Sequence, residues 1–214
     1  MKPFLFAVFL TAISTCLAEP AEEIAKLESR AVSGDATAQF DLAEAYDKGA
    51  GTGKDEKKAA MWYEKAAAQG VVQAQFNIGI MYANGQGVSK DDEKAVAWYQ
   101  KAAEQGLADA QFNVGVMHAA GRGVPKNEKL AVEWYEKAAL RGLTRAQFNL
   151  GIMSALGQGM PKNGMLAYAW FDVAASTGDP QAKRNRDFIE KQMKPEQKAQ
   201  GKKLSQEIAA RIKK

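Results

Sequence analysis

The feature that most constrains the fold of this sequence is a stretch that recurs three times at a spacing of 36 residues. "AQFNIGIMYANGQG" at 74–87 is followed by "AQFNVGVMHAAGRG" at 110–123 and by "AQFNLGIMSALGQG" at 146–159. Four units align without a gap, and they cover residues 35–70, 71–106, 107–142 and 143–178. A period of about 20–50 residues is typical of repeat proteins, in which each unit is one supersecondary element that packs on its neighbours.

Aromatic residues keep this register through all four units. The tryptophans form one column and an aromatic residue follows each of them: Trp62, Trp98, Trp134 and Trp170, then Tyr63, Tyr99, Tyr135 and Phe171. A tryptophan side chain buries ~150–250 Å². A single unit of this size cannot bury such a face by itself, so the units are expected to stack.

Each unit has the pattern of two helices. Ala74, Ile78 and Tyr82 lie at helical spacing, and glycines follow them. Asp or Asn stands where the second helix is expected to begin, as an N-cap: Asp55, Asp91, Asn127 and Asn163. The register predicts helices near 36–48 and 55–69 and then at steps of 36 residues, which makes the fold all-α.

Three glycines occupy positions in the middle of the expected first helices. Gly79, Gly115 and Gly151 each cost about 1 kcal/mol relative to alanine at such a position. Close approach of a neighbouring helix would offset this cost. We therefore expect tight helix packing at these three glycines.

The repeated residues resemble the Sel-one-like repeat (SLR) family. Residues 71–106 carry its pattern as Ala74, Ile78, Gly79, Tyr82, Gly85, Gly87, Val88, Asp91, Lys94, Ala95, Trp98, Tyr99, Lys101, Ala102, Ala103 and Gly106. The resemblance implies a right-handed superhelical solenoid of stacked tetratricopeptide-like α-hairpins that acts as a protein-interaction scaffold. The chain departs from the pattern at Ala43, which replaces a glycine, and at His118 and Ser154, which replace a tyrosine.

Residues 1–18 have the pattern of a signal peptide. Lys2 precedes an apolar run at 4–13, which is too short to span a bilayer, and Ala18 offers a cleavage site. We expect cleavage after Ala18 and a periplasmic or secreted protein of bacterial type. An uncleaved anchor and lipidation of Cys16 are the alternatives. Cys16 is the only cysteine, so cleavage leaves a chain without disulfides.

The segments on either side of the repeats are expected to cap them. Residues 19–34 align with a lone second helix, and residues 179–214 predict capping helices, the last of which opens at Pro195. The C-terminal segment is basic, with 11 Lys and Arg against 4 Asp and Glu from residue 183 onward. A solvated polar cap explains this charge, and contact with a membrane surface or a polyanion is the alternative.

No catalytic motif is recognisable. The glycine-rich "GAGTGK" at 49–54 lacks the spacing of a phosphate-binding loop and follows an expected helix instead of a strand. His118 is the only histidine, which favours a structural position over a metal site. The motifs of β-lactam-hydrolysing enzymes are absent. We predict a protein that is not an enzyme and has no cofactor and no metal.

One polar column suggests a binding site on the concave face of the first helices. Asn77, Asn113 and Asn149 could hold the backbone of an extended peptide whose side chains meet the preceding aromatic column, Phe76, Phe112 and Phe148. In the alternative, the asparagines satisfy local hydrogen bonds and the phenylalanines belong to the core.

The sequence therefore predicts an exported, monomeric scaffold that binds a protein or peptide and no nucleic acid. Membrane contact is expected only through the signal peptide, a lipidated Cys16 or the basic C-terminal tail. Two alternative functions remain open at this point. One is a hydrolase of β-lactam or cell-wall substrates, and the other is an inhibitor or immunity protein that caps a toxin.

Overall fold

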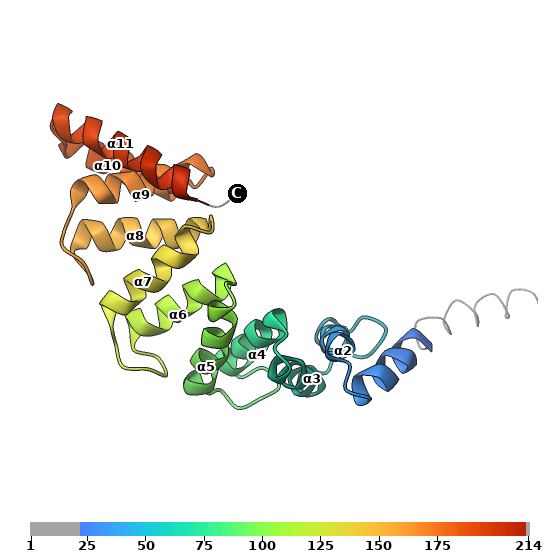
Figure 1. Cartoon of the computed structure of the whole chain (residues 1–214). Coiled ribbons are helices and arrows are strands. Elements are labelled where there is room, and N and C mark those ends of the chain that lie inside the picture. The colour runs from blue at the N-terminus through green and yellow to red at the C-terminus, as the bar shows by residue number, and fades with distance from the viewer. Residues whose placement is uncertain (1–21, 213–214) are drawn as a thin grey trace, which may run out of the picture. The chain divides into compact units, whose positions relative to one another are not determined.

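The structure is a computed structural model that describes residues 22–212 (Figure 1). Its regular secondary structure is α-helical, without a strand among the described residues. The predicted signal peptide, its cleavage site and Cys16 lie outside this range. No helix within residues 22–212 has the length and apolar character needed to cross a membrane. The chain divides into two compact units, Met1–Asp91 and Asp92–Lys214.

The first unit contains the N-terminal helix and one and a half repeats. Residues 22–32 are helical. They are followed by α2 (Ala36–Lys48), α3 (Glu56–Ala68) and α4 (Val72–Asn84). Consecutive helices pack on one another, α2 on α3 and α3 on α4.

The second unit contains the remaining repeat helices and the C-terminal helices. They are α5 (Asp92–Glu104), α6 (Ala108–Ala120), α7 (Glu128–Ala139), α8 (Thr144–Leu156), α9 (Gly164–Ser176), α10 (Pro180–Gln192) and α11 (Pro195–Arg211). Each helix from α5 to α9 packs on the next one along the chain, and α11 packs on α9 (Figure 1). The expected all-α fold of stacked helical hairpins is confirmed.

The predicted N-cap residues make hydrogen bonds at the start of the second helices. Asp55 accepts a hydrogen bond from the backbone N–H of Lys58, and Asn127 accepts one from Leu130. These bonds satisfy donors that the first turn of a helix leaves free. The second helices therefore begin where the Asp and Asn column places them.

The glycines in the middle of the first helices allow close packing. A Cβ atom on Gly115 would lie 2.7 Å from the Tyr135 ring, and one on Gly151 would lie 2.6 Å from the Phe171 ring. Real Cβ atoms do not approach this closely, so only glycine fits. The expectation of tight packing is confirmed at these two positions.

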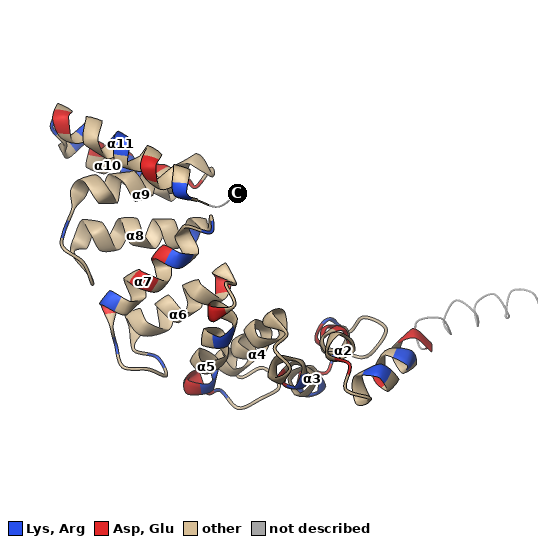
Figure 2. Ribbon diagram, viewed as in Figure 1, with Lys and Arg blue, Asp and Glu red and all other residues tan. Residues whose placement is uncertain are grey.

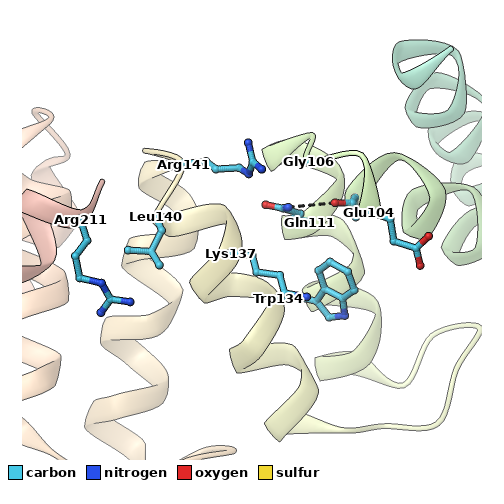
Figure 3. A pocket seen from close by; sticks show the side chains of 9 residues that line it. Glu104, Gly106, Gln111, Trp134, Lys137, Leu140, Arg141 and Arg211 are labelled. Carbon is cyan, nitrogen blue, oxygen red and sulfur yellow. Dashed lines mark hydrogen bonds between the residues drawn. The ribbon is translucent and has the colours of Figure 1, made fainter. Parts of the chain in front are cut away.

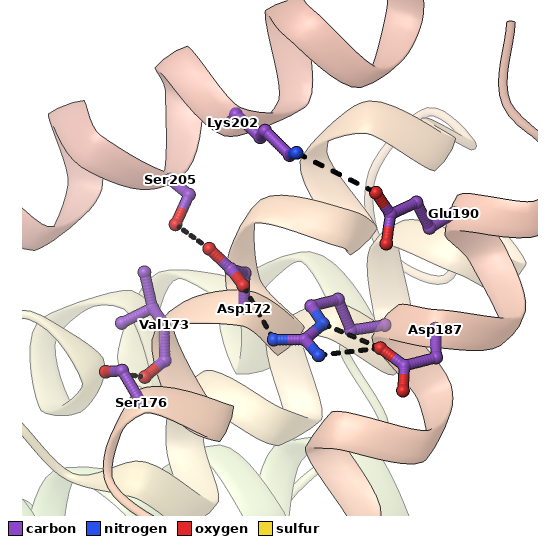
Figure 4. A network of polar contacts seen from close by, with 8 residues as sticks. Asp172, Val173, Ser176, Asp187, Glu190, Lys202 and Ser205 are labelled. Atoms are coloured by element: carbon purple, nitrogen blue, oxygen red, sulfur yellow. Dashed lines mark hydrogen bonds and ion pairs between the residues drawn. The ribbon is translucent and has the colours of Figure 1, made fainter. Parts of the chain in front are cut away.

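The helix α11 covers the end of the second unit. Gly201 in α11 is buried against the ring of Tyr168 in α9. Ser205 donates a hydrogen bond of 2.7 Å to Asp172 of α9 (Figure 4). Arg186 of α10 donates to the same carboxylate. A buried Ile208 extends this contact into the core around Leu150.

Candidate functional site

The three asparagines of the predicted binding column lie on first helices and are half-buried. Asn77 lies on α4, Asn113 on α6 and Asn149 on α8. Each lies near the hydroxyl of a tyrosine on the preceding second helix and lowers the pKa of that tyrosine: Tyr63 for Asn77, Tyr99 for Asn113 and Tyr135 for Asn149. The column therefore ties each first helix to the helix before it.

The environment of Tyr99 illustrates this contact. Burial raises the pKa of Tyr99 to about 12, because the charged phenolate loses its hydration. The hydrogen bond from Asn113 lowers the pKa by a smaller amount, because it stabilises the phenolate. An asparagine amide carries two donors and an acceptor, so one such bond leaves capacity for a second partner.

The phenylalanines beside these asparagines are half-buried and pack on aromatic rings. The rings of Phe112 and Tyr135 are 5.4 Å apart, and those of Phe148 and Phe171 are 5.5 Å apart. The Arg145 guanidinium lies 4.4 Å from the centre of the Phe112 ring. Phe76 is half-buried on α4. Contact of these rings with a ligand stays a prediction.

A groove lies beside the asparagine column in the first unit, between the first helices α2 and α4. It has a volume of about 280 Å³. Tyr63 and Asn77 line it together with Ile80 of α4 and with Glu44 and Asp47 of α2. The predicted residue Asn77 therefore borders space that a ligand could enter.

The second unit repeats this groove between its own first helices. A groove of about 270 Å³ between α6 and α8 is lined by Tyr135, Asn149 and Ile152, which are the counterparts of Tyr63, Asn77 and Ile80. One repeat further, a groove of about 220 Å³ lies between α8 and α10. We call these three depressions the first-helix grooves.

Charge is sparse on α4, α6 and α8, whereas α2 and α10 carry several charged residues. Figure 2 shows α4 without a charged residue, and α6 and α8 each carry a single one. Glu44 and Asp47 of α2 line the groove of the first unit, and Lys126 and Glu128 line the groove between α6 and α8. Lys54 contacts Glu56 at 3.0 Å, and Lys126 contacts Glu128 at 2.8 Å.

A column of buried glutamines, which the sequence analysis did not single out, holds the repeats together. Each side-chain amide donates to a backbone carbonyl near the end of the preceding second helix: Gln39 to Ala31, Gln75 to Ala67, Gln111 to Ala103 and Gln147 to Ala139. These glutamines stand in the repeated "AQF". Their recurrence at an expected core position of a helix could have identified this column from the sequence.

A separate open pocket of about 490 Å³ lies in the second unit (Figure 3). The Lys137 ammonium stands 3.9 Å above the Trp134 ring, and the Arg141 guanidinium lies against Gly106. The side-chain oxygen of Gln111 is buried there without a hydrogen-bond partner in the described structure. The Arg141 side chain is long enough to close this pocket, so we do not assign a ligand to the pocket.

His118 occupies a buried position in the tyrosine column. In the earlier repeats the tyrosines donate to glutamates, Tyr46 to Glu28 at 2.7 Å and Tyr82 to Glu64 at 3.0 Å. Neither ring nitrogen of His118 has a hydrogen-bond partner among residues 22–212. The same residues contain no cluster of His, Cys, Asp and Glu that could hold a metal ion.

Stacked helical hairpins with a repeating groove define the chain as an α-hairpin repeat protein. Residues 36–71, 72–107, 108–143 and 144–179 match the Sel1 repeat, and the chain belongs to this family. Sel1 repeat proteins generally act as protein–protein interaction scaffolds. The predicted resemblance is thereby confirmed. A comparison with curated protein sequences finds no significant match.

Solved structures share the fold, and two of them are also similar in sequence. A protective antigen present in uropathogenic Escherichia coli strains, which displays an SLR fold, is 36% identical with a TM-score of 0.78, over 88% of this chain and 41% of that one. A Sel1 repeat protein from Oxalobacter formigenes is 37% identical with a TM-score of 0.72, over 81% of this chain and 72% of that one. The chain thus spans less than half the length of the E. coli protein.

Proposed function

We propose that this chain is an exported, non-enzymatic scaffold and that a protein or peptide partner binds along its first helices. The observation that carries the proposal is the recurrence of one groove in both units, each time beside the same asparagine column. The sparse charge on α4, α6 and α8 and the half-buried amides suit an extended segment, which needs hydrogen bonds along its backbone and room for its side chains.

Export is the second part of the proposal. The apolar run at 4–13 and the small residue Ala18 support a signal peptide that is removed after Ala18, with the mature chain in the periplasm or secreted. Fractionation of bacteria that express the full chain, followed by N-terminal sequencing, tests this. A mature protein that begins at Glu19 is expected, and an intact N-terminus in the cytoplasm would contradict it.

Capture of partners by a groove variant tests the binding proposal. Ala119 lines the groove between α6 and α8, and Asp47 stands in the same column of the first repeat, so a polar residue is compatible with the fold. We expect Ala119→Arg to fill the groove and to lose partners that the mature wild type captures from periplasmic extract. Ala120→Arg, at the exposed neighbouring position, is the matched control.

Each outcome of this experiment is informative. Proteins recovered by the wild type and by Ala120→Arg, but not by Ala119→Arg, support binding in the groove. Equal recovery by all three proteins would place the partner elsewhere. Circular dichroism of each variant excludes loss of the fold as the cause.

A further inference from the structure

The groove between α8 and α10 differs from its counterparts at its floor. Phe171 stands in the column of Tyr135, so the floor carries no hydroxyl. Asn185, the counterpart of Asn149, therefore has no tyrosine to bond. It is half-buried beside the groove, and its amide makes no hydrogen bond among residues 22–212. This amide is available to a ligand.

The walls of the same groove carry large apolar side chains that are exposed to solvent. Leu156 is 62% exposed and stands in the column of Ala120, while Phe188 is 67% exposed and stands in the column of Ile152. Both also line an adjoining depression of about 700 Å³. Exposed leucine and phenylalanine facing one concavity favour its occupation by another apolar group.

The rim of this groove carries an unpaired positive charge. The charge belongs to Lys162, which corresponds to Lys126 of the preceding repeat. Lys126 is paired with Glu128, but Gly164 stands where Lys162 would find that glutamate. Lys162 lines the adjoining depression and makes no ion pair within residues 22–212. On α10, exposed cationic residues also stand one helical turn to either side of Phe188, namely Arg184 and Lys191.

We propose that the groove between α8 and α10 binds an acidic segment of a partner protein through one bulky apolar side chain. The apolar side chain enters between Leu156 and Phe188 above Phe171, and Asn185 bonds the backbone of the segment. A carboxylate beside the apolar residue pairs with Lys162. This inference rests on the proposed protein-binding function and specifies the chemistry of the partner.

The observations favour a partner protein over a second copy of this chain. The large apolar residues outside the groove that are exposed in the described structure are Val32 and Met61. Val32 lies between Glu28 and Asp35, but these carboxylates are already bonded to Tyr46 and Arg30. Met61 has Lys57 and Lys65 one turn away on either side. The cations beside Met61 would repel the cationic rim, and the carboxylates beside Val32 are already paired, so neither residue offers the free acidic flanks that the groove selects.

Fluorescence anisotropy with three labelled peptides tests the proposal on the mature chain. The first peptide is Gly-Asp-Glu-Phe-Asp-Glu-Gly, the second replaces its phenylalanine by alanine, and the third replaces its acidic residues by lysine. We expect the first peptide to bind at least about tenfold more tightly than either of the others, since it alone supplies both the anchor and the charge.

Variants at exposed positions locate the site without threatening the fold. Phe188→Ser is expected to weaken the first peptide about tenfold, as loss of an anchor contact does. Lys162→Glu is expected to weaken it about threefold at low salt, and by less at high salt. The matched controls are Val32→Ser, an exposed apolar residue elsewhere, and Lys129→Glu, an exposed lysine on α7, and both should leave the affinity unchanged.

Other outcomes would overturn the inference. Equal affinity for the three peptides, or equal weakening by Phe188→Ser and Val32→Ser, means that the groove does not select an acidic apolar segment. A wild-type dimer that Phe188→Ser converts to a monomer, without peptide binding, assigns the groove to a second copy. Binding to anionic phospholipid vesicles in place of the peptide assigns it to a membrane.

Failure of this inference is distinguishable from failure of the proposed function. Periplasmic partners that depend on Ala119 but not on Phe188 would leave the scaffold function standing while removing the groove between α8 and α10 from it. If no partner depends on either groove, both the proposed function and this inference are contradicted.

Discussion

The side-chain amide of Gln69 donates a hydrogen bond of 2.8 Å to the side-chain oxygen of Gln39. The amide of Gln39 in turn donates to a backbone carbonyl, so both ends of this buried side chain are paired. Two repeats later Arg141 stands in the column of Gln69, and the oxygen of Gln111 has no partner in the described structure. The third repeat thus lacks a bond that the first one makes.

Restoring this bond is expected to stabilise the protein. Arg141→Gln supplies a donor to the buried oxygen of Gln111 and should raise the free energy of unfolding by about 0.5–1.5 kcal/mol. Urea denaturation measures the change. Arg141→Ala, which removes the arginine without supplying a donor, is the control, and equal stability of the two variants would contradict the prediction.

Alanine in place of Gly151 should destabilise the second unit. The new Cβ would meet the Phe171 ring at 2.6 Å, and overpacking of this kind costs ~1–3 kcal/mol. The cost is expected to exceed the gain of about 1 kcal/mol in helix propensity. Gly164→Ala, where no atom lies within 4 Å of the new Cβ, should be neutral or stabilising. A higher melting temperature for Gly151→Ala would show that the contact relaxes freely.

The repeat made most of the fold predictable from the sequence. The helices and their N-caps depend on local residue types, such as Asp55 and Asn127, and four aligned copies strengthen each of these signals. The close contacts of Gly115 and Gly151 were also predictable, because a glycine in the middle of a helix implies a compensating contact. The partner rings, Tyr135 and Phe171, required the structure.

The candidate site was less predictable, because a column of residues does not show what each side chain contacts. Asn113 lies 14 positions after Tyr99 but on the next helix, so the periodicity of a single helix does not link the two. Phe188 and Leu156 have the residue types of a core, yet both are exposed. Exposure of this kind follows from tertiary packing and not from local sequence.

Stability at high pH should depend on Tyr46. Its hydrogen bond to Glu28, followed by burial, raises the pKa of Tyr46 from 10.0 to about 12. A pKa that is higher in the folded state means that the stabilisation is complete below about pH 10 and is lost as the pH rises toward 12. The stability difference between the wild type and Tyr46→Phe should therefore shrink over this interval. Thermal melts at several pH values measure it, and a constant difference would contradict the coupling.

Catalysis is not expected of the mature chain. His118 is buried, and neither of its nitrogens contacts a hydroxyl among the described residues. The hydroxyl of Ser154 donates to the sulfur of Met160 instead of to a base. A general base must lie within hydrogen-bond reach of its nucleophile. We expect no hydrolysis of a chromogenic β-lactam or of peptidoglycan above background. Turnover that survives repurification and disappears on a single substitution would establish the hydrolase alternative.

Asn113 allows the structural and binding roles of the asparagine column to be separated. Asn113→Ala removes the hydrogen bond to Tyr99 and should lower the free energy of unfolding by about 0.5–1.5 kcal/mol. In a Tyr99→Phe background that bond is already absent, so the same substitution should cost less stability there. A double-mutant cycle measures this coupling.

Affinity measured on the same four proteins decides whether Asn113 also contacts a ligand. The probe is a partner captured by the mature wild type. If the amide bonds the backbone of this partner, Asn113→Ala weakens binding in both backgrounds, because Tyr99 is not part of that contact. If all four proteins bind with the same affinity and stability is lost only in the Tyr99 background, the asparagine column serves only to join successive helices. The partner would then contact the walls of the first-helix grooves and not the asparagines.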